Sequence, residues 1–326
     1  MKQQPKIDLH CHLDGSLNVA LVRRFLQEEG EEHACAELEA QMRAPADCPS
    51  LADYLARFAL PIRCLQTRAH LCAAAETLAA DAAAEGVVYL EVRFAPSFCT
   101  QGGLSVRDTI ESVQEGLARA ERAHDIRTGI IVCGMRHMPM ETNLAMLRAA
   151  RGQLGAGVVA CDLAGDERAW PNALFGEFFA LAKQLDMPCT IHSGECGSAE
   201  NVRAAVEMGA RRLGHGIAMA ADPALMRLCA AKGIGAELCP TSNFQTKAAT
   251  AWADYPLRAF LAAGVPVSLN TDNRTVSGTT STREWALAVQ HCALTEEEQA
   301  KIYRSSVEMA FAPDDVKQRL LQKWGE

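Results

Sequence analysis

Two histidines stand two residues apart near the N-terminus, in the run 7–12, which reads IDLHCH. Successive side chains of a β-strand point to opposite faces, so residues i and i+2 share a face. His10 and His12 can therefore direct two imidazoles at one point, whereas Cys11 points away from it. Imidazole is the most common protein ligand of zinc-type metals. The run predicts the beginning of a metal site whose other ligands come from elsewhere in the chain.

Side chains suited to the same chemistry follow apolar runs later in the chain. His192 and Glu195 follow one such run. His215 follows a second and Asp272 a third. If these runs are parallel strands of one barrel, their carboxyl ends meet at one mouth. Three kinds of group would then converge there: the imidazoles, the side-chain carboxyl group of Glu195, and the carboxylate of Asp272 after the last strand.

Short apolar, β-branched runs alternate with longer segments rich in Ala, Leu, Glu and Arg. Many of the short runs are continuously apolar, as is typical of parallel strands buried on both faces. We predict strands near 6–11, 87–94, 128–133, 157–162, 187–192, 211–214, 234–239 and 265–270. We predict helices near 69–85, 106–124, 142–151, 173–185, 199–208, 222–232 and 254–263.

Eight strand–helix units in about 300 residues predict the α/β class and a (β/α)8 TIM barrel. A doubly wound open sheet is the alternative, and the absence of a glycine-rich phosphate loop after the first strand disfavours it. Residues 13–68 read as an insertion of two or three helices on the catalytic face. The chain after residue 284 reads as closing helices, with Thr295 as an N-cap. No linker divides the chain, so 1–326 is expected to be one domain.

Composition bounds the partners and the compartment. The chain has 326 residues, of which 49% are hydrophobic, and a formal net charge of −8. This acidic balance argues against nucleic-acid binding, which needs a basic patch. No apolar stretch approaches the roughly 20 residues that span a bilayer. The N-terminus lacks an apolar signal core, and the 13 scattered cysteines read as reduced thiols, so we expect a cytoplasmic protein without membrane partners.

Six motifs in fixed order resemble the adenosine deaminase family of zinc-dependent amidohydrolases. They are HCHLDG (10–15), DLAGDE (162–167), IHSGE (191–195), LGHG (213–216), CPTSN (239–243) and NTDN (270–273). The resemblance spans residues 7 to about 283. It implies a (β/α)8 barrel that deaminates adenosine and 2′-deoxyadenosine to inosine and deoxyinosine, releasing ammonia.

The resemblance also implies roles for the residues at the mouth of the barrel. One zinc ion would be held by His10, His12, His192 and Asp272, with a position left for water. Binuclear relatives bridge two metals with a lysine of the fourth strand, and the run 158–167 has none. Metal-bound hydroxide would attack purine C6. The proton donor to N1 would be Glu195, the proton acceptor Asp272, and the group orienting the hydroxide His215.

Substrate contacts follow from the same resemblance. The backbone N–H of Gly165 would face purine N3, and Asp14 would accept a hydrogen bond from a ribose hydroxyl. His12 would contact the substrate as well as the metal. Many members carry aspartate where Asn273 stands; an asparagine amide can donate to N7 directly, whereas aspartate must first be protonated. The i, i+3, i+4, i+7 spacing of apolar residues predicts one face of a lid helix. Its members are Leu51, Tyr54, Leu55 and Phe58.

Other functions remain as alternatives. The same chemistry could act on aminodeoxyfutalosine or on free adenine, although adenine-specific members tend to carry glutamate where Asp14 stands. Phosphoester or lactone hydrolysis would keep the metal but fits a single-metal site with Glu195 less well. A purine-binding protein without activity is disfavoured because every expected catalytic position is filled.

Overall fold

The computed structural model describes residues 4–31, 37–196 and 198–324. Eight parallel strands form two four-stranded sheets, in the orders β1-β2-β3-β4 and β5-β6-β7-β8. The strands are β1 Lys6–His12, β2 Val87–Phe94, β3 Arg127–Met135, β4 Val158–Ala164, β5 Thr190–Ser193, β6 Arg212–His215, β7 Gly235–Leu238 and β8 Val267–Leu269.

Single parallel bridges join the two sheets at both edges. Cys161 of β4 pairs with Cys189, directly before β5, and Cys11 of β1 pairs with Asp272, just beyond β8. At the second junction, the backbone N–H of His12 donates to Asp272 O at 2.7 Å, and the N–H of Asp272 donates to His10 O at 2.7 Å. The eight strands therefore follow one another around a common interior, and the predicted (β/α)8 class is confirmed.

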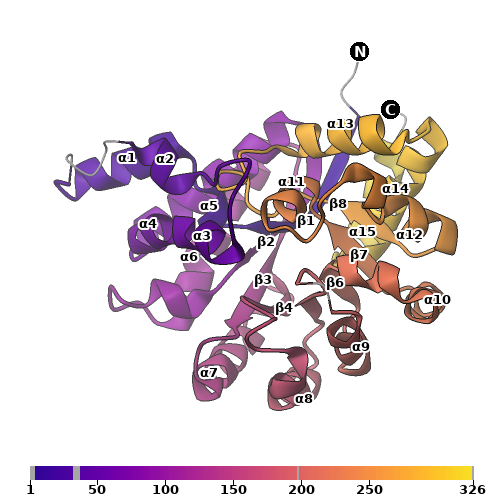
Figure 1. The fold of residues 1–326 in the computed structure, drawn as a ribbon. Coiled ribbons are helices and arrows are strands. Elements are labelled where there is room, and N and C mark those ends of the chain that lie inside the picture. The colour runs from indigo at the N-terminus through magenta and orange to yellow at the C-terminus, as the bar shows by residue number, and fades with distance from the viewer. Residues whose placement is uncertain (1–3, 32–36, 197, 325–326) are drawn as a thin grey trace.

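Helices follow the strands in the chain, and most of them lie toward the outside of the molecule (Figure 1). They are α5 Arg68–Ala84, α6 Val106–Ala123, α7 Met140–Arg151, α8 Gly176–Gln184, α9 Ala199–Glu207, α10 Pro223–Lys232, α11 Pro240–Gln245, α12 Leu257–Ala263, α13 Ser281–Cys292, α14 Glu296–Met309 and α15 Asp314–Lys323. Capping boxes begin two of them: Ser105 pairs with Asp108 at α6, and Thr295, as predicted, pairs with Glu298 at α14. Across the described part of the chain, no helix is both long and apolar enough to cross a membrane.

The insertion after β1 contains more helices than the two or three predicted. Its described residues form four α-helices and two 3-10 turns: η1 Asp14–Ser16, α1 Val19–Glu28, α2 Leu38–Met42, α3 Leu51–Leu55, η3 Ala56–Phe58 and α4 Ala59–Cys64. The prediction of a single lid helix through Phe58 was also wrong. Pro61 has no N–H to give to the carbonyl of Arg57, and its ring crowds that carbonyl. The chain therefore tightens into η3 between α3 and α4.

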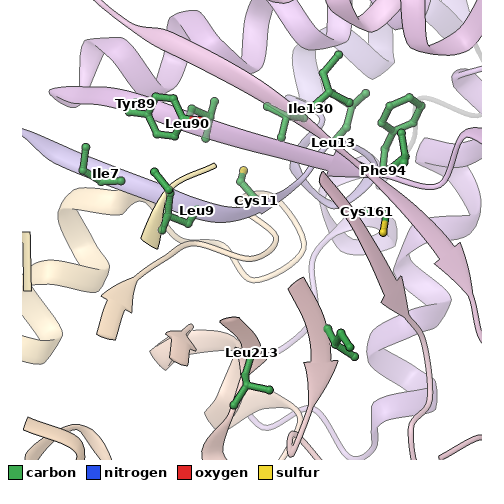
Figure 2. Close-up of a cluster of buried hydrophobic side chains, with 14 of the residues drawn as sticks. Ile7, Leu9, Cys11, Leu13, Tyr89, Leu90, Phe94, Ile130, Cys161 and Leu213 are labelled. Atoms are coloured by element: carbon green, nitrogen blue, oxygen red, sulfur yellow. The ribbon is translucent and has the colours of Figure 1, made fainter. Parts of the chain in front are cut away.

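The alternation of β1 separates packing from chemistry. Ile7, Leu9 and Cys11 belong to the main hydrophobic cluster and are at most 1% exposed. Figure 2 shows them with side chains from neighbouring strands, among them Tyr89 and Leu90 of β2. The intervening side chains of β1 occupy the other face, which leaves the two histidines free for the site.

Candidate metal centre and active site

Four predicted ligands come together at the carboxyl ends of the strands. His10 and His12 end β1, His192 lies in β5, and Asp272 follows β8. One ligand atom from each lies within 4.8 Å of the others. The Nε2 atoms of His12 and His192 are 3.3 Å apart. The Oδ1 atom of Asp272 lies 3.3 Å from Nε2 of His10 and 3.4 Å from Nε2 of His12.

The contacts behind two of these imidazoles, His10 and His192, fit a bound cation. The Nδ1 atom of His10 is hydrogen-bonded to Glu237 Oε2 at 2.8 Å, and Nδ1 of His192 lies 2.7 Å from Asp162 Oδ2. A proton on each Nδ1 leaves the Nε2 lone pairs directed at the shared point. Among the described residues, none forms a hydrogen bond of suitable geometry with the buried Nε2 of His10. Burial lowers the pKa of His10 to about 4, so this imidazole is neutral, as a metal ligand must be.

A buried arginine holds the two carboxylates behind the histidines. Arg93 of β2 donates to Asp162 Oδ2 at 2.8 Å and to Glu237 Oε2 at 2.7 Å, and all three side chains are fully buried. Burial alone would raise the pKa of Glu237, but Arg93 and Arg212 outweigh it and hold that pKa well below its usual range. The sequence analysis assigned no role to these residues. The sequence did carry a signal for this group: each of three apolar strands contains one charged residue, and a buried charge needs a partner of opposite charge.

Two site residues are held in the left-handed backbone region, which side-chain-bearing residues rarely adopt. His215 has φ of 62° and Asp272 has φ of 58°. His215 is the last residue of the short strand β6, and Asp272 lies in the loop just after the short strand β8. This conformation costs free energy and persists only where surrounding contacts enforce it, a pattern that clusters at functional sites.

The ring of His215 is oriented by an amide that the sequence analysis did not single out. Asn243 Nδ2 lies 3.0 Å from Nδ1 of His215. Asn243 Oδ1 accepts from the backbone N–H of Cys239 at 3.2 Å and from Tyr255 Oη at 3.0 Å, so its amide nitrogen must be the group that faces the imidazole. The proton of neutral His215 is then on Nε2, which lies 3.7 Å from Glu195 Oε2.

The backbone around Glu195 is held by Glu167. Glu167 Oε2 accepts from the N–H of Gly194 at 2.8 Å, and Oε1 accepts from the N–H of Cys196 at 2.5 Å. The backbone N–H groups of both neighbours of Glu195 are thus anchored to the loop after β4. Glu167 is the last residue of the DLAGDE motif. The motif pointed to this residue, but only the fold shows that it holds the backbone beside Glu195.

The predicted residues border one cavity of about 510 Å³. His10 is not part of its wall and lies behind it, fully buried. The predicted residues that line the cavity are His12, Asp14, Leu51, Tyr54, Leu55, Phe58, Gly165, His192, Glu195, His215, Asp272 and Asn273. Phe98, His137 and Trp170, which the sequence analysis did not assign to the site, add aromatic surface to the wall.

The residues predicted to contact substrate are placed as follows. Asp14 is 9% exposed, and burial raises its pKa to about 6. Its side chain accepts from its neighbour Gly15 at 3.1 Å, while the N-cap of α1 is Asn18. Gly165 follows β4 with φ of 107°, which favours glycine. The amide nitrogen of Asn273 donates to Tyr54 Oη at 2.9 Å.

A second group of potential ligands shares a member with the first. His215, Cys239 and Asp272 also bring ligand atoms within 4.8 Å of one another. Burial raises the pKa of the Cys239 thiol well above its usual range, and a thiol binds metal as the thiolate. The three-histidine group is therefore the better metal site.

Comparisons with known proteins agree with this geometry. A profile of the adenosine deaminase family matches residues 5–325. An adenosine deaminase from Enterococcus faecalis is 40% identical over 99% of this chain and 96% of its own length. One from Vibrio vulnificus is 42% identical over 97% of each chain. The crystal structure of an adenine deaminase from Arthrobacter aurescens superposes with a TM-score of 0.90 at 25% identity, covering 98% of each chain. This chain belongs to the adenosine deaminase family.

Proposed function

We propose that this protein hydrolyses the 6-amino group of adenosine and 2′-deoxyadenosine, and that residues 1–326 form one domain for this reaction. The observation that carries the proposal is that one cavity is lined by members of the metal-ligand group together with Glu195 and His215, with Asp14 on the same wall. Relatives about 40% identical over nearly the whole chain are named adenosine deaminases, which supports the choice of substrate.

One zinc ion is the cofactor that these residues fit, held by His10, His12, His192 and Asp272. When bound, zinc supplies a Lewis acid that lowers the pKa of water to near neutrality. No lysine stands in β4 or in the loop up to Glu167 to bridge a second metal.

The protein's own residues manage the protons of the reaction. The Glu195 carboxylic acid donates to N1 as water adds to C6, so that the ring does not accumulate negative charge. The proton released by the water passes to Asp272, and the Nε2–H of His215 donates a hydrogen bond to the entering oxygen. Asp272 then gives its proton to the amino nitrogen, the C6–N bond breaks with release of ammonia, and the proton on the new C6 oxygen returns to Glu195. Adenosine and water give inosine and ammonia.

Other residues orient the nucleoside in this scheme. The N–H of Gly165 donates to N3, and Asp14 accepts a hydrogen bond from a ribose hydroxyl. The apolar wall of the lid segment excludes water from the ring, which strengthens every hydrogen bond inside the cavity.

Free adenine is the alternative substrate, and a structural similarity supports it. The adenine deaminase from Arthrobacter aurescens has the same fold over 98% of each chain. The buried carboxylate of Asp14 argues for a nucleoside, because it accepts from the nearby backbone N–H of Gly15 and keeps further acceptor positions for a ribose hydroxyl.

The test is ultraviolet absorbance of adenosine with the zinc-loaded protein, before and after chelation. We expect a fall in absorbance near the adenosine maximum, formation of inosine, loss of the reaction on chelation and recovery with added zinc. Comparing kcat/KM for adenosine, aminodeoxyfutalosine and adenine ranks the substrates. Absence of ammonia release from adenosine and 2′-deoxyadenosine would overturn the proposal.

A further inference from the structure

The hydroxyl of Tyr54 is a polar group on the apolar lid. Tyr54 is 2% exposed and is the buried residue of α3, whereas its neighbour Leu55 is 40% exposed. Its ring packs in a small cluster with Ala44, Cys48 and Val276. This packing fixes where the hydroxyl oxygen lies, because a buried aromatic ring has only two rotatable side-chain bonds.

The hydroxyl connects two groups of the loop after β8. Asn273 Nδ2 donates to Tyr54 Oη at 2.9 Å, and Tyr54 Oη lies 2.7 Å from Ser277 Oγ. If Tyr54 gives its proton to Ser277, its oxygen is free to accept from the amide. The side chains then form one directional chain, from Asn273 through Tyr54 to Ser277.

The amide of Asn273 is confined on its other side by Gly15. A Cβ atom added to Gly15 would lie 1.8 Å from Asn273 Oδ1, so this oxygen faces the bare backbone of the first turn after β1. Asn273 Oδ1 is buried and has no hydrogen-bond partner among residues 4–31, 37–196 and 198–324. The NH2 group, in contrast, has Tyr54 as its acceptor. One of its two hydrogens is thereby used, and the other remains for a ligand in the cavity that Asn273 lines.

We propose that the Tyr54 hydroxyl is a specificity-determining positioning group that locks the Asn273 amide with its second N–H directed at purine N7. An unlocked amide could rotate and present its carbonyl oxygen, which N7, itself an acceptor, would repel. The Tyr54 hydroxyl and the Asn273 amide thus act as a pair, and α3 supplies one of the two groups on which recognition of N7 depends. This inference rests on the proposed function, since it needs a purine nucleoside with C6 at the metal centre.

Inosine and 7-deazainosine test the proposal, because they differ only in having nitrogen or C–H at ring position 7. Their inhibition constants against adenosine deamination are compared in the zinc-loaded wild type and in Tyr54→Phe, which keeps the ring. We expect the wild type to prefer inosine by about tenfold. Tyr54→Phe should lower this preference about fivefold or more while changing the inhibition constant of 7-deazainosine less than about threefold. Ser277→Ala, which removes the acceptor of the Tyr54 proton, should lower the preference in the same direction.

Leu55→Ala is the matched control on the same helix. It should weaken both ligands alike and keep their ratio, because Leu55 offers only apolar surface. Equal weakening of both ligands by Tyr54→Phe would show that Tyr54 only packs the lid, and an absent wild-type preference for inosine would show that N7 is not read; either result overturns the inference alone. A wild type that does not deaminate adenosine would instead overturn the proposed function, and the inference with it.

Discussion

At the scale of single residues, several reactive side chains are held by buried groups behind them or by contacts to the adjacent backbone. Glu237 and Asp162 lie behind the histidine ligands, Asn243 lies behind His215, and Glu167 holds the peptides around Glu195. These partners fix the tautomer and direction of each group before substrate arrives. Such preorganisation is what makes donors and acceptors effective in a dry cavity.

Replacing Glu195 with glutamine should remove the proton donor to N1 while keeping the shape of the site. We expect kcat to fall by about 100-fold or more, with zinc content and the affinity for inosine close to those of the wild type. Steady-state kinetics, metal analysis and product inhibition check this. Glu200→Gln, on the exposed first turn of α9, is the control. A Glu195→Gln protein with a tenth of wild-type turnover would contradict the assignment of Glu195 as the acid.

At the scale of elements, the loops after β7 and β8 are fastened by the helix that follows them. Glu284 of α13 accepts from the backbone N–H of Thr241, near the start of α11, at 3.0 Å, and it contacts the hydroxyl of Thr279. These contacts tie α11, which carries Asn243, to the segment beyond Asp272. Burial raises the pKa of Glu284 to about 7, and the nearby charge of Asp8 acts in the same direction.

This raised pKa predicts how stability depends on pH. A carboxyl with a higher pKa in the folded than in the unfolded state binds more protons when folded, so its contribution declines as pH rises from about 4.5 through 7. Glu284→Gln should remove about 2 kcal/mol of the loss in unfolding free energy between pH 5 and pH 8. Urea unfolding at both pH values measures it, with the exposed Glu207→Gln as control. An unchanged pH dependence in Glu284→Gln would contradict this origin.

At the scale of the whole molecule, the candidate metal ligands come from both sheets. His10 and His12 belong to the first sheet, His192 belongs to the second, and Asp272 lies at the junction that closes them. A bound ion therefore links segments that are distant in the chain, in addition to the single bridges and the ion pair of Arg93 with Glu237 that cross between the sheets. Binding that requires the folded arrangement stabilises the folded state by mass action.

Removal of zinc should accordingly lower the thermal stability. We expect Tm to fall on the order of 5–10 °C in metal-depleted protein and to recover when zinc is restored. Differential scanning calorimetry with parallel metal analysis provides the measurement. His192→Ala should show little response to added zinc. Equal Tm values for verified metal-free and zinc-loaded wild type would contradict a metal held across the two sheets.

The pattern of apolar runs in the sequence, and the residues that follow them, were sufficient to predict the class of fold and the reactive residues. Continuous apolar runs marked the strands because both faces of a parallel strand are buried, and the histidines, Glu195 and Asp272 follow strand ends where a barrel places its chemistry. Tertiary structure alone decided which partners hold them. Arg93 meets Asp162 and Glu237 across three strands, Tyr54 meets Asn273 from 219 positions away, and the 3-10 turn η3 ends the predicted lid helix at Leu55. Local pattern encodes which face of an element is buried, whereas a hydrogen bond between distant segments depends on distances that only the assembled fold sets.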